Sequence, residues 1–143
     1  MTVPPKPTDT RPSPAGVREY RLPGGWVLLV GRTDADNDHL SLKMAAPNDL
    51  WFHVRGMPGS HVILRARPGE TPAAETIKAA AAAAAYFSKA REGGWVPVAC
   101  TQARYVTKPR GAKPGTVSIR KEKIYKVRPA LPEPGNGPGE EPA

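Results

Sequence analysis

Seven consecutive alanines, Ala79 to Ala85, constrain the fold of this chain more than any other feature. Alanine is the strongest helix former, and a face of methyl groups lets a helix approach a neighbouring sheet closely. Thr71 can cap such a helix, Pro72 suits its first turn, and Gly93-Gly94 follow its last turn. The sequence therefore predicts a helix from about Pro72 to Arg91. The residues that share its predicted apolar face are Ile77, Ala80, Ala81, Ala84 and Phe87.

Short apolar runs on both sides of this helix indicate strands. Leu40, Leu42 and Met44 alternate with polar residues, and the acidic stretch 31–39 before them favours a turn. Strands, one helix and further strands predict an α+β fold, with a mostly antiparallel sheet packed against one main alanine-rich helix. The other predicted strands are 27–30, 50–54, 61–64, 96–101, 105–107, 116–119 and 124–127.

Proline and glycine separate the two ends of the chain from its middle. Of the 143 residues, 18 are proline and 14 are glycine, and five prolines lie within residues 1–16. Residues 129–143 contain five more prolines and no pattern that would form a core. A segment without large apolar side chains cannot offset its ordering entropy. We therefore expect a flexible arm over 1–16, a single domain over 17–128 and a disordered tail over 129–143.

Several classes of protein do not fit this sequence. No apolar run approaches the roughly 18 residues that span a bilayer, and the first residues contain no hydrophobic signal core. Cys100 is the only cysteine, which excludes an internal disulfide framework and a multi-cysteine zinc site. We expect a cytoplasmic protein that does not bind a membrane and requires no cofactor.

Positive charge is concentrated in one stretch, residues 104–128. The chain has 21 Lys and Arg against 13 Asp and Glu, a net charge of +8, and this stretch holds nine of the cations with one acid, Glu122. The remainder of the chain is neutral. A local field around the glycine-proline segment 108–115 is typical of a phosphate-binding surface, with Tyr105 and Tyr125 available for stacking. The alternative is a solvated strand edge that deters pairing with other strands. The cations are Arg104, Lys108, Arg110, Lys113, Arg120, Lys121, Lys123, Lys126 and Arg128.

A second cluster of reactive side chains lies within residues 49–61. Alternation along a strand puts Asp49, Trp51 and His53 on one face, and the turn that follows can bring His61 across to that face. Four hypotheses remain open: a metal or acid–base site, a serine nucleophile, a core cluster around the tryptophan, and direct contact with RNA by imidazole and guanidinium groups. The residues are Asp49, Trp51, His53, Arg55, Ser60 and His61.

Taken in order, six blocks of residues strongly resemble the NFACT-R domain, and the resemblance extends from about Gly25 to Val127. These blocks are Val30-Gly31-Arg32 with Asn37-Asp38, Lys43-Met44-Ala45, Asp49-x-Trp51-Phe52-His53, Gly59-Ser60-His61-Val62, Ser88-Lys89-Ala90-Arg91 and Lys108-Pro109-x-Gly111-Ala112-Lys113-Pro114-Gly115.

The resemblance implies a domain that binds RNA. In larger NFACT proteins this domain follows an NFACT-N domain, a helix-hairpin-helix pair and a coiled coil. Those proteins act in ribosome quality control, where they engage tRNA at an obstructed large ribosomal subunit and add alanine-containing tails without a message. The sequence matches only the RNA-binding domain, so only RNA binding is carried over. A separate protein partner can supply the other NFACT domains.

We therefore predict an RNA-binding module for tRNA or ribosomal RNA, and no catalytic or metal-binding residues. The alternatives are an RNA-processing or hydrolytic enzyme that uses Asp49, His53 and His61, and a module that docks on a protein at the ribosome. We also expect both histidines to gain charge between about pH 7.5 and 6, which would strengthen contacts with phosphate. The expected RNA contacts are Asp49, Trp51, His53, Arg55, Ser60, His61, Arg104, Lys108, Arg110, Lys113, Arg120, Lys121 and Lys123.

Overall fold

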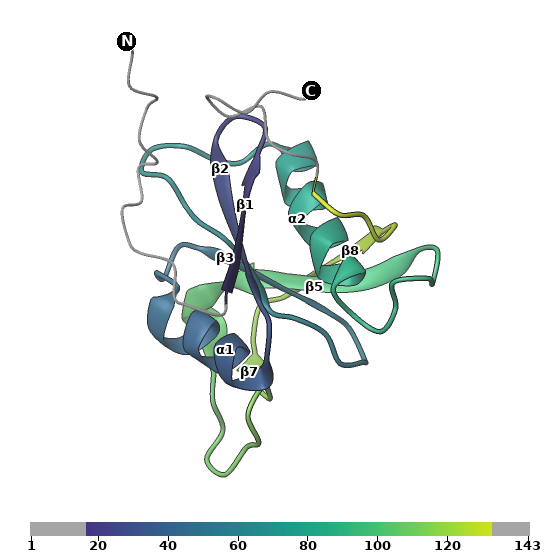
Figure 1. The fold of residues 1–143 in the computed structure, drawn as a ribbon. Coiled ribbons are helices and arrows are strands. Elements are labelled where there is room, and N and C mark those ends of the chain that lie inside the picture. Colours follow the sequence, from purple (N-terminus) through teal and green to yellow (C-terminus); the bar gives the residue numbers. More distant parts are fainter. Residues whose placement is uncertain (1–16, 133–143) are drawn as a thin grey trace.

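An antiparallel sheet of six strands organises the computed structural model, which describes residues 17–132 (Figure 1). Every neighbouring pair of strands is antiparallel, and the order across the sheet is β1-β2-β4-β3-β5-β8. The α+β class is confirmed. The strands are β1 (Val17–Leu22), β2 (Trp26–Gly31), β3 (Leu50–Val54), β4 (Val62–Leu64), β5 (Val96–Gln102) and β8 (Lys123–Val127).

One face of the sheet is covered by helix α2 (Ala74–Tyr86), which contains the alanine run. Five alanines of this helix are fully buried against strand residues such as Phe52 and Val98. A side chain larger than a methyl group at these positions would force the helix away from the sheet. The buried alanines are Ala80, Ala81, Ala83, Ala84 and Ala85.

The opposite face is covered by three short elements and a small hairpin. They are α1 (Asp34–His39), the π-helical turn η1 (Leu40–Met44), the 3-10 turn η2 (Ala103–Tyr105), and strands β6 (Val106–Thr107) and β7 (Ser118–Ile119). Trp51 of β3 lies at the centre of this second layer, against Leu40, Ile63 and Val106. The sheet is therefore enclosed between two layers of different construction.

The prediction of a turn over 31–39 and a strand over 40–44 is wrong, because this segment is helical. The Thr33 hydroxyl accepts a hydrogen bond from the Asp36 amide at 3.0 Å, and acidic side chains in the first turn suit the positive end of a helix. Leu40 and Met44 also fit helical i,i+4 spacing, and Leu40 is fully buried. The alternation of apolar and polar residues over only five positions therefore did not distinguish a strand from a helix.

The main helix is shorter than predicted at both ends. It begins at Ala74 after Ala73, which supplies no side-chain cap, so the expected cap by Thr71 is wrong. It ends at Tyr86, beyond which the Ser88 hydroxyl donates to the Ala85 carbonyl at 2.6 Å and accepts from the Ala90 amide at 3.0 Å. These local bonds replace the next helical turn.

The remaining predicted strands are confirmed to within a few residues, except that 105–107 and 116–119 shrink to the two-residue strands β6 and β7. Strand β1 was not predicted. Residues 129–132, expected in the tail, run along α2, where the Ala130 amide donates to the Ala82 carbonyl at 3.2 Å. The predictions for 1–16 and 133–143 lie outside the described residues. Nowhere in 17–132 does a helix have the length and apolar character to cross a bilayer.

Candidate nucleic-acid interface

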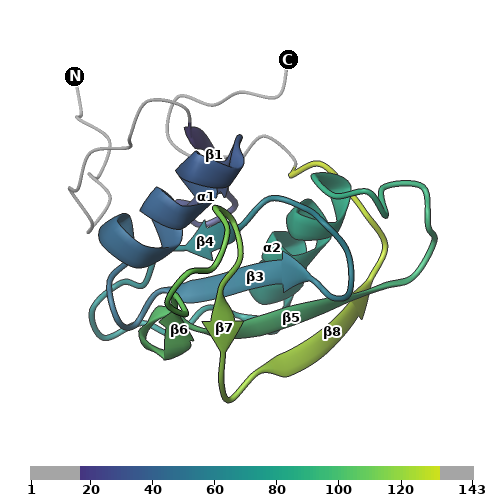
Figure 2. The same ribbon diagram turned by 90° about the horizontal axis from the view of Figure 1, so that it is seen from below.

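The segment 108–116 between β6 and β7, which we call the basic loop, is fastened to α1 by its own lysine and a glycine (Figure 2). Lys108 Nζ donates to the Thr116 carbonyl at 2.9 Å and to the Lys113 carbonyl, and it pairs with Asp38 Oδ2 at 3.0 Å. The Gly115 amide donates to Asp38 Oδ1 at 3.0 Å. Lys108 therefore stabilises the conformation of the basic loop and its contact with α1.

Gly115 is required where the basic loop meets α1. Its φ is +86°, and a Cβ atom there would lie 2.8 Å from Asp34 Oδ1. Gly111, in the same loop, has a similar φ of +80°, but a Cβ atom there would meet nothing within 4 Å. Both glycines have a backbone conformation that strains other residues, but only Gly115 is also packed closely against a neighbour. Comparison of substitutions at the two positions therefore measures the cost of the close packing alone.

Alanine at Gly115 is expected to lower the free energy of unfolding by about 0.5–1.5 kcal/mol more than alanine at Gly111, because only Gly115→Ala requires the Asp34 side chain to move aside. Denaturant unfolding of both variants measures the difference. Equal effects would show that the contact with Asp34 yields without cost.

His61 ties the other side of the basic loop to the sheet through a chain of hydrogen bonds. Its ring contacts the Gly115 carbonyl through Nε2 at 3.1 Å and the Ser41 hydroxyl through Nδ1 at 2.8 Å, while Trp51 Nε1 donates to Ser41 Oγ at 2.9 Å. The carbonyl can only accept and the indole can only donate. Consequently Nε2 carries the ring proton, and Nδ1 accepts the proton of the serine hydroxyl.

Both histidines are neutral near physiological pH. Burial lowers the pKa of His61 to about 4, assisted by His53, against the opposing effect of the Gly115 carbonyl. Burial also lowers the pKa of His53, although backbone hydrogen bonds at Gly59 and Val54 oppose it. The expectation that His61 gains charge between about pH 7.5 and 6 is therefore wrong.

The rings of Trp51, His53 and His61 form one cluster, as strand alternation predicted. The ring centroids lie 5.9 Å apart for Trp51 and His53, and 5.3 Å apart for each of these with His61. The serine in contact with the His61 ring is Ser41, which the sequence reasoning missed because it placed that residue on a strand. Ser60, the serine of the nucleophile hypothesis, donates its amide to the Phe87 carbonyl at 2.9 Å.

Asp49 has a structural position. Its two carboxylate oxygens accept hydrogen bonds from the Ala46 and Ala66 amides, each at 2.8 Å, and the residue is 1% exposed. Across residues 17–132 no group of three His, Cys, Asp or Glu is placed to hold a metal ion. Asp49, Trp51 and His61 are all buried, so they offer little surface for direct contact with RNA.

Two clefts flank the surface where the expected RNA contacts reach solvent. The small cleft, about 680 Å³, lies between the basic loop and the 55–59 turn, and its lining includes His53, Arg55, Lys113 and Glu122. The large cleft, about 1460 Å³, lies on the α2 side of the sheet. Most of the sequence-predicted residues therefore line one of these two clefts, and those that line neither are Ser60, Lys108, Arg110 and Arg120.

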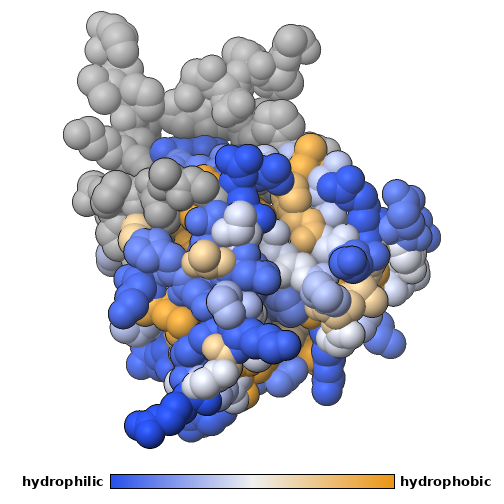
Figure 3. Space-filling view, turned by 60° about the horizontal axis from the view of Figure 1, so that its bottom comes forward, coloured by the Kyte–Doolittle hydropathy of each residue, from blue (hydrophilic) through white to orange (hydrophobic). Residues whose placement is uncertain are grey.

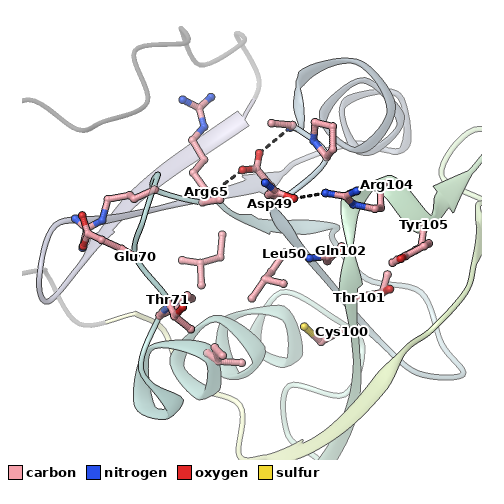
Figure 4. A pocket seen from close by; sticks show the side chains of 18 of the residues that line it. Asp49, Leu50, Arg65, Glu70, Thr71, Cys100, Thr101, Gln102, Arg104 and Tyr105 are labelled. Atoms are coloured by element: carbon pink, nitrogen blue, oxygen red, sulfur yellow. Dashed lines mark hydrogen bonds and ion pairs between the residues drawn. The ribbon is translucent and has the colours of Figure 1, made fainter.

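The large cleft has an apolar floor and a cationic rim (Figure 4). Its floor includes Leu50, Leu64, Ile77 and Cys100, and burial raises the pKa of the Cys100 thiol to about 12, which keeps it protonated. One rim is formed by residues of η2, of the turn before β8 and of β8 itself. These are Arg104, Tyr105, Lys121, Lys123 and Tyr125.

Eight of the nine cations in 104–128 are exposed, and the exception is Lys108. The face in Figure 3 is dominated by hydrophilic residues with small hydrophobic patches between them. Arg110 and Lys113 lie on the basic loop, and the Arg120 guanidinium lies 5.4 Å from the centre of the Tyr105 ring. Exposed cations thus lie on the basic loop, on the rim of the large cleft and, at Arg120, against Tyr105 of that rim.

Comparison with known proteins identifies the same domain. The family model of the NFACT protein RNA binding domain matches residues 17–121. A protein named Rqc2 homolog RqcH from Bacillus subtilis (strain 168) is 42% identical over 110 residues, which are 77% of this chain and 19% of that protein. Its namesake from Streptococcus pneumoniae serotype 2 (strain D39 / NCTC 7466) is 38% identical over 106 residues, 74% of this chain and 19% of that protein.

A solved structure shares the fold. The C-terminal part of the fibronectin/fibrinogen-binding protein from Streptococcus suis superposes with a TM-score of 0.75 and 39% sequence identity, covering 82% of this chain and 47% of that chain. The chain spans about a fifth of the length of the curated relatives. The resemblance inferred from the six blocks is confirmed, and the chain belongs to the NFACT-R family of RNA-binding domains.

Proposed function

We propose that this domain binds structured RNA, tRNA or ribosomal RNA, as a non-catalytic module in ribosome quality control. The proposal is supported by the family match, by the eight exposed cations of 104–128 and by the geometry of the basic loop. Lysine and arginine that neutralise phosphates supply most of the affinity of such surfaces.

The basic loop is the single observation that supports this proposal most strongly. Lys108 is engaged with Asp38 and with two carbonyls of its own loop, whereas Arg110 and Lys113 are exposed. One lysine therefore shapes the loop and two cations remain for phosphate. The glycines and prolines of the loop carry no long side chains, so a nucleic-acid backbone can approach the loop closely.

The small cleft adds contacts of another kind. Arg55 and His53 lie beside Lys113 there, and the lowered pKa of His53 leaves a neutral imidazole. A neutral ring can stack on an unpaired base or exchange a hydrogen bond with a 2′-hydroxyl group. Shape and 2′-hydroxyl contacts would favour folded RNA over DNA.

The ribosomal context rests on the relatives. They carry the name Rqc2 homolog RqcH, and this chain corresponds to about a fifth of their length. We infer that tail addition, which the resemblance connects with the larger proteins, requires domains beyond this one. The domain described here would contribute RNA affinity in the cytoplasm, at the large ribosomal subunit, alone or with a protein partner that carries those domains.

Replacing Arg110 and Lys113 together by alanine is expected to weaken binding to a tRNA about tenfold or more and to reduce the log–log salt slope by roughly 1–2, because two phosphate contacts are lost. Fluorescence anisotropy at several salt concentrations measures both. The matched control is Lys43→Ala with Lys78→Ala, two exposed lysines outside both clefts, which removes the same charge.

An equal loss of tRNA affinity in both double variants would show that the basic loop contributes only through the net charge of the protein. An unchanged affinity in the loop variant would place RNA elsewhere. The tRNA is expected to stay intact during long incubation, because Asp49 is held by two amides and His61 is buried. Cleavage that disappears in His53→Ala would support the hydrolytic alternative.

A further inference from the structure

We propose that the large cleft is a second RNA subsite, one that takes an unpaired strand with its bases on the apolar floor and its phosphates on the cationic rim. This inference rests on the proposed RNA binding and names the kind of RNA that the domain selects. It concerns a different part of the surface from the basic loop, on the α2 side of the sheet.

The size and the floor of the cleft favour a chain-like ligand with exposed rings. Its volume of about 1460 Å³ exceeds the roughly 300–1,000 Å³ of typical small-molecule sites. The apolar floor, with Leu50 and Cys100 between Thr71 on one side and Tyr105 on the other, is visible in Figure 4. A duplex keeps its bases inside and could not bring them to a recessed floor.

The rim carries the charge and the aromatic rings that unpaired RNA uses. Arg104, Lys121 and Lys123 are exposed there, and Lys121 Nζ lies 5.6 Å from the centre of the Tyr105 ring. Tyr125 is half-buried on the same rim. Cationic grooves with aromatic side chains are the common construction of single-strand binding surfaces.

The two carboxylates in the lining are engaged by other groups of the fold. Asp49 accepts two backbone amides, and Glu70 pairs with Arg67 at 3.1 Å. Lys121 also has a left-handed backbone conformation, with φ 57°, the only such residue other than glycine within 17–132. Strained residues of this kind concentrate at binding sites. The rim also continues through Arg120 toward the basic loop, which favours RNA over an acidic peptide as the occupant.

The test compares two RNA hairpins, one with a blunt stem and one with the same stem and a 3′ extension of about four nucleotides. The native protein is expected to bind the extended hairpin about tenfold more tightly, since each stacked base contributes severalfold. Leucine at both Tyr105 and Tyr125 should remove this advantage, whereas phenylalanine at both should keep it because the rings remain. Binding to the blunt hairpin should be the same in all three proteins.

A second measurement does not depend on variants. Photocrosslinking with 4-thiouridine in the extension is expected to label peptides that contain Tyr105, Lys121 or Tyr125. Equal affinity of the native protein for the two hairpins, or crosslinks only at the small cleft, would overturn the subsite. Labelling of the large cleft by an acidic peptide that the extension cannot displace would overturn it as well. Failure of both hairpins to bind would instead refute the proposed function itself.

Discussion

Replacing Trp51 by alanine is expected to lower the free energy of unfolding by about 3–5 kcal/mol. The indole is 2% exposed and lies in the second core layer, against Leu40 and Ile63. Its loss would leave a cavity, and it would also remove the donor to the buried Ser41 hydroxyl. Denaturant unfolding followed by circular dichroism measures the change.

Trp95 provides a matched control within the same chain. This residue is 64% exposed, and its ring has a contact with the Arg128 guanidinium at 5.1 Å. Trp95→Ala should change stability by no more than about 0.5 kcal/mol. Comparable losses in the two variants would contradict the core position of Trp51.

The second large effect is the loss of folding stability at acidic pH. Because burial lowers the pKa of His61 to about 4, the unfolded chain takes up a proton near pH 6.5 that the folded protein does not bind until about pH 4. Stability from this group is complete above pH 6.5 and declines as the pH falls to about 4, by roughly 3 kcal/mol in total. Burial of His53 acts in the same direction.

Comparison with His61→Gln isolates this contribution, since carboxylates also titrate in the acid range. The variant should be less stable than the native protein at pH 7 and should lose less stability between pH 6.5 and pH 4. His39→Gln, at an exposed histidine on α1, is the matched control substitution. Parallel curves for the native protein and the His61 variant would show that His61 is protonated freely in the fold.

Segments whose pattern fits one kind of structure were predicted correctly from the sequence. The alanine run predicted the main helix, and apolar runs bounded by turn residues predicted β2, β3, β4, β5 and β8. Segments whose pattern fits two kinds of structure were not. Residues 40–44 satisfy both a period of two and an i,i+4 spacing, and the bond that decides for a helix, from the Asp36 amide to Thr33, is local and polar.

The candidate site shows the same division. The concentration of charge in 104–128 and the shared face of Trp51 and His53 were evident from composition and alternation. The inward role of Lys108 was not, because it depends on Asp38, which lies seventy residues earlier in the chain. Ser41 was missed for a related reason, since its contact with His61 exists only after α1 and η1 pack on the sheet.

The anchoring of the basic loop also determines when its conformational entropy is lost. Fixing the backbone of one residue costs about 1–2 kcal/mol, and residues 108–116 are ordered when the domain folds, through Asp38, His61 and Lys108. An arriving RNA therefore meets a surface that needs no further ordering, and amide exchange in the loop should slow little on binding. Substitutions at these anchors would weaken RNA affinity without touching any group that contacts a phosphate.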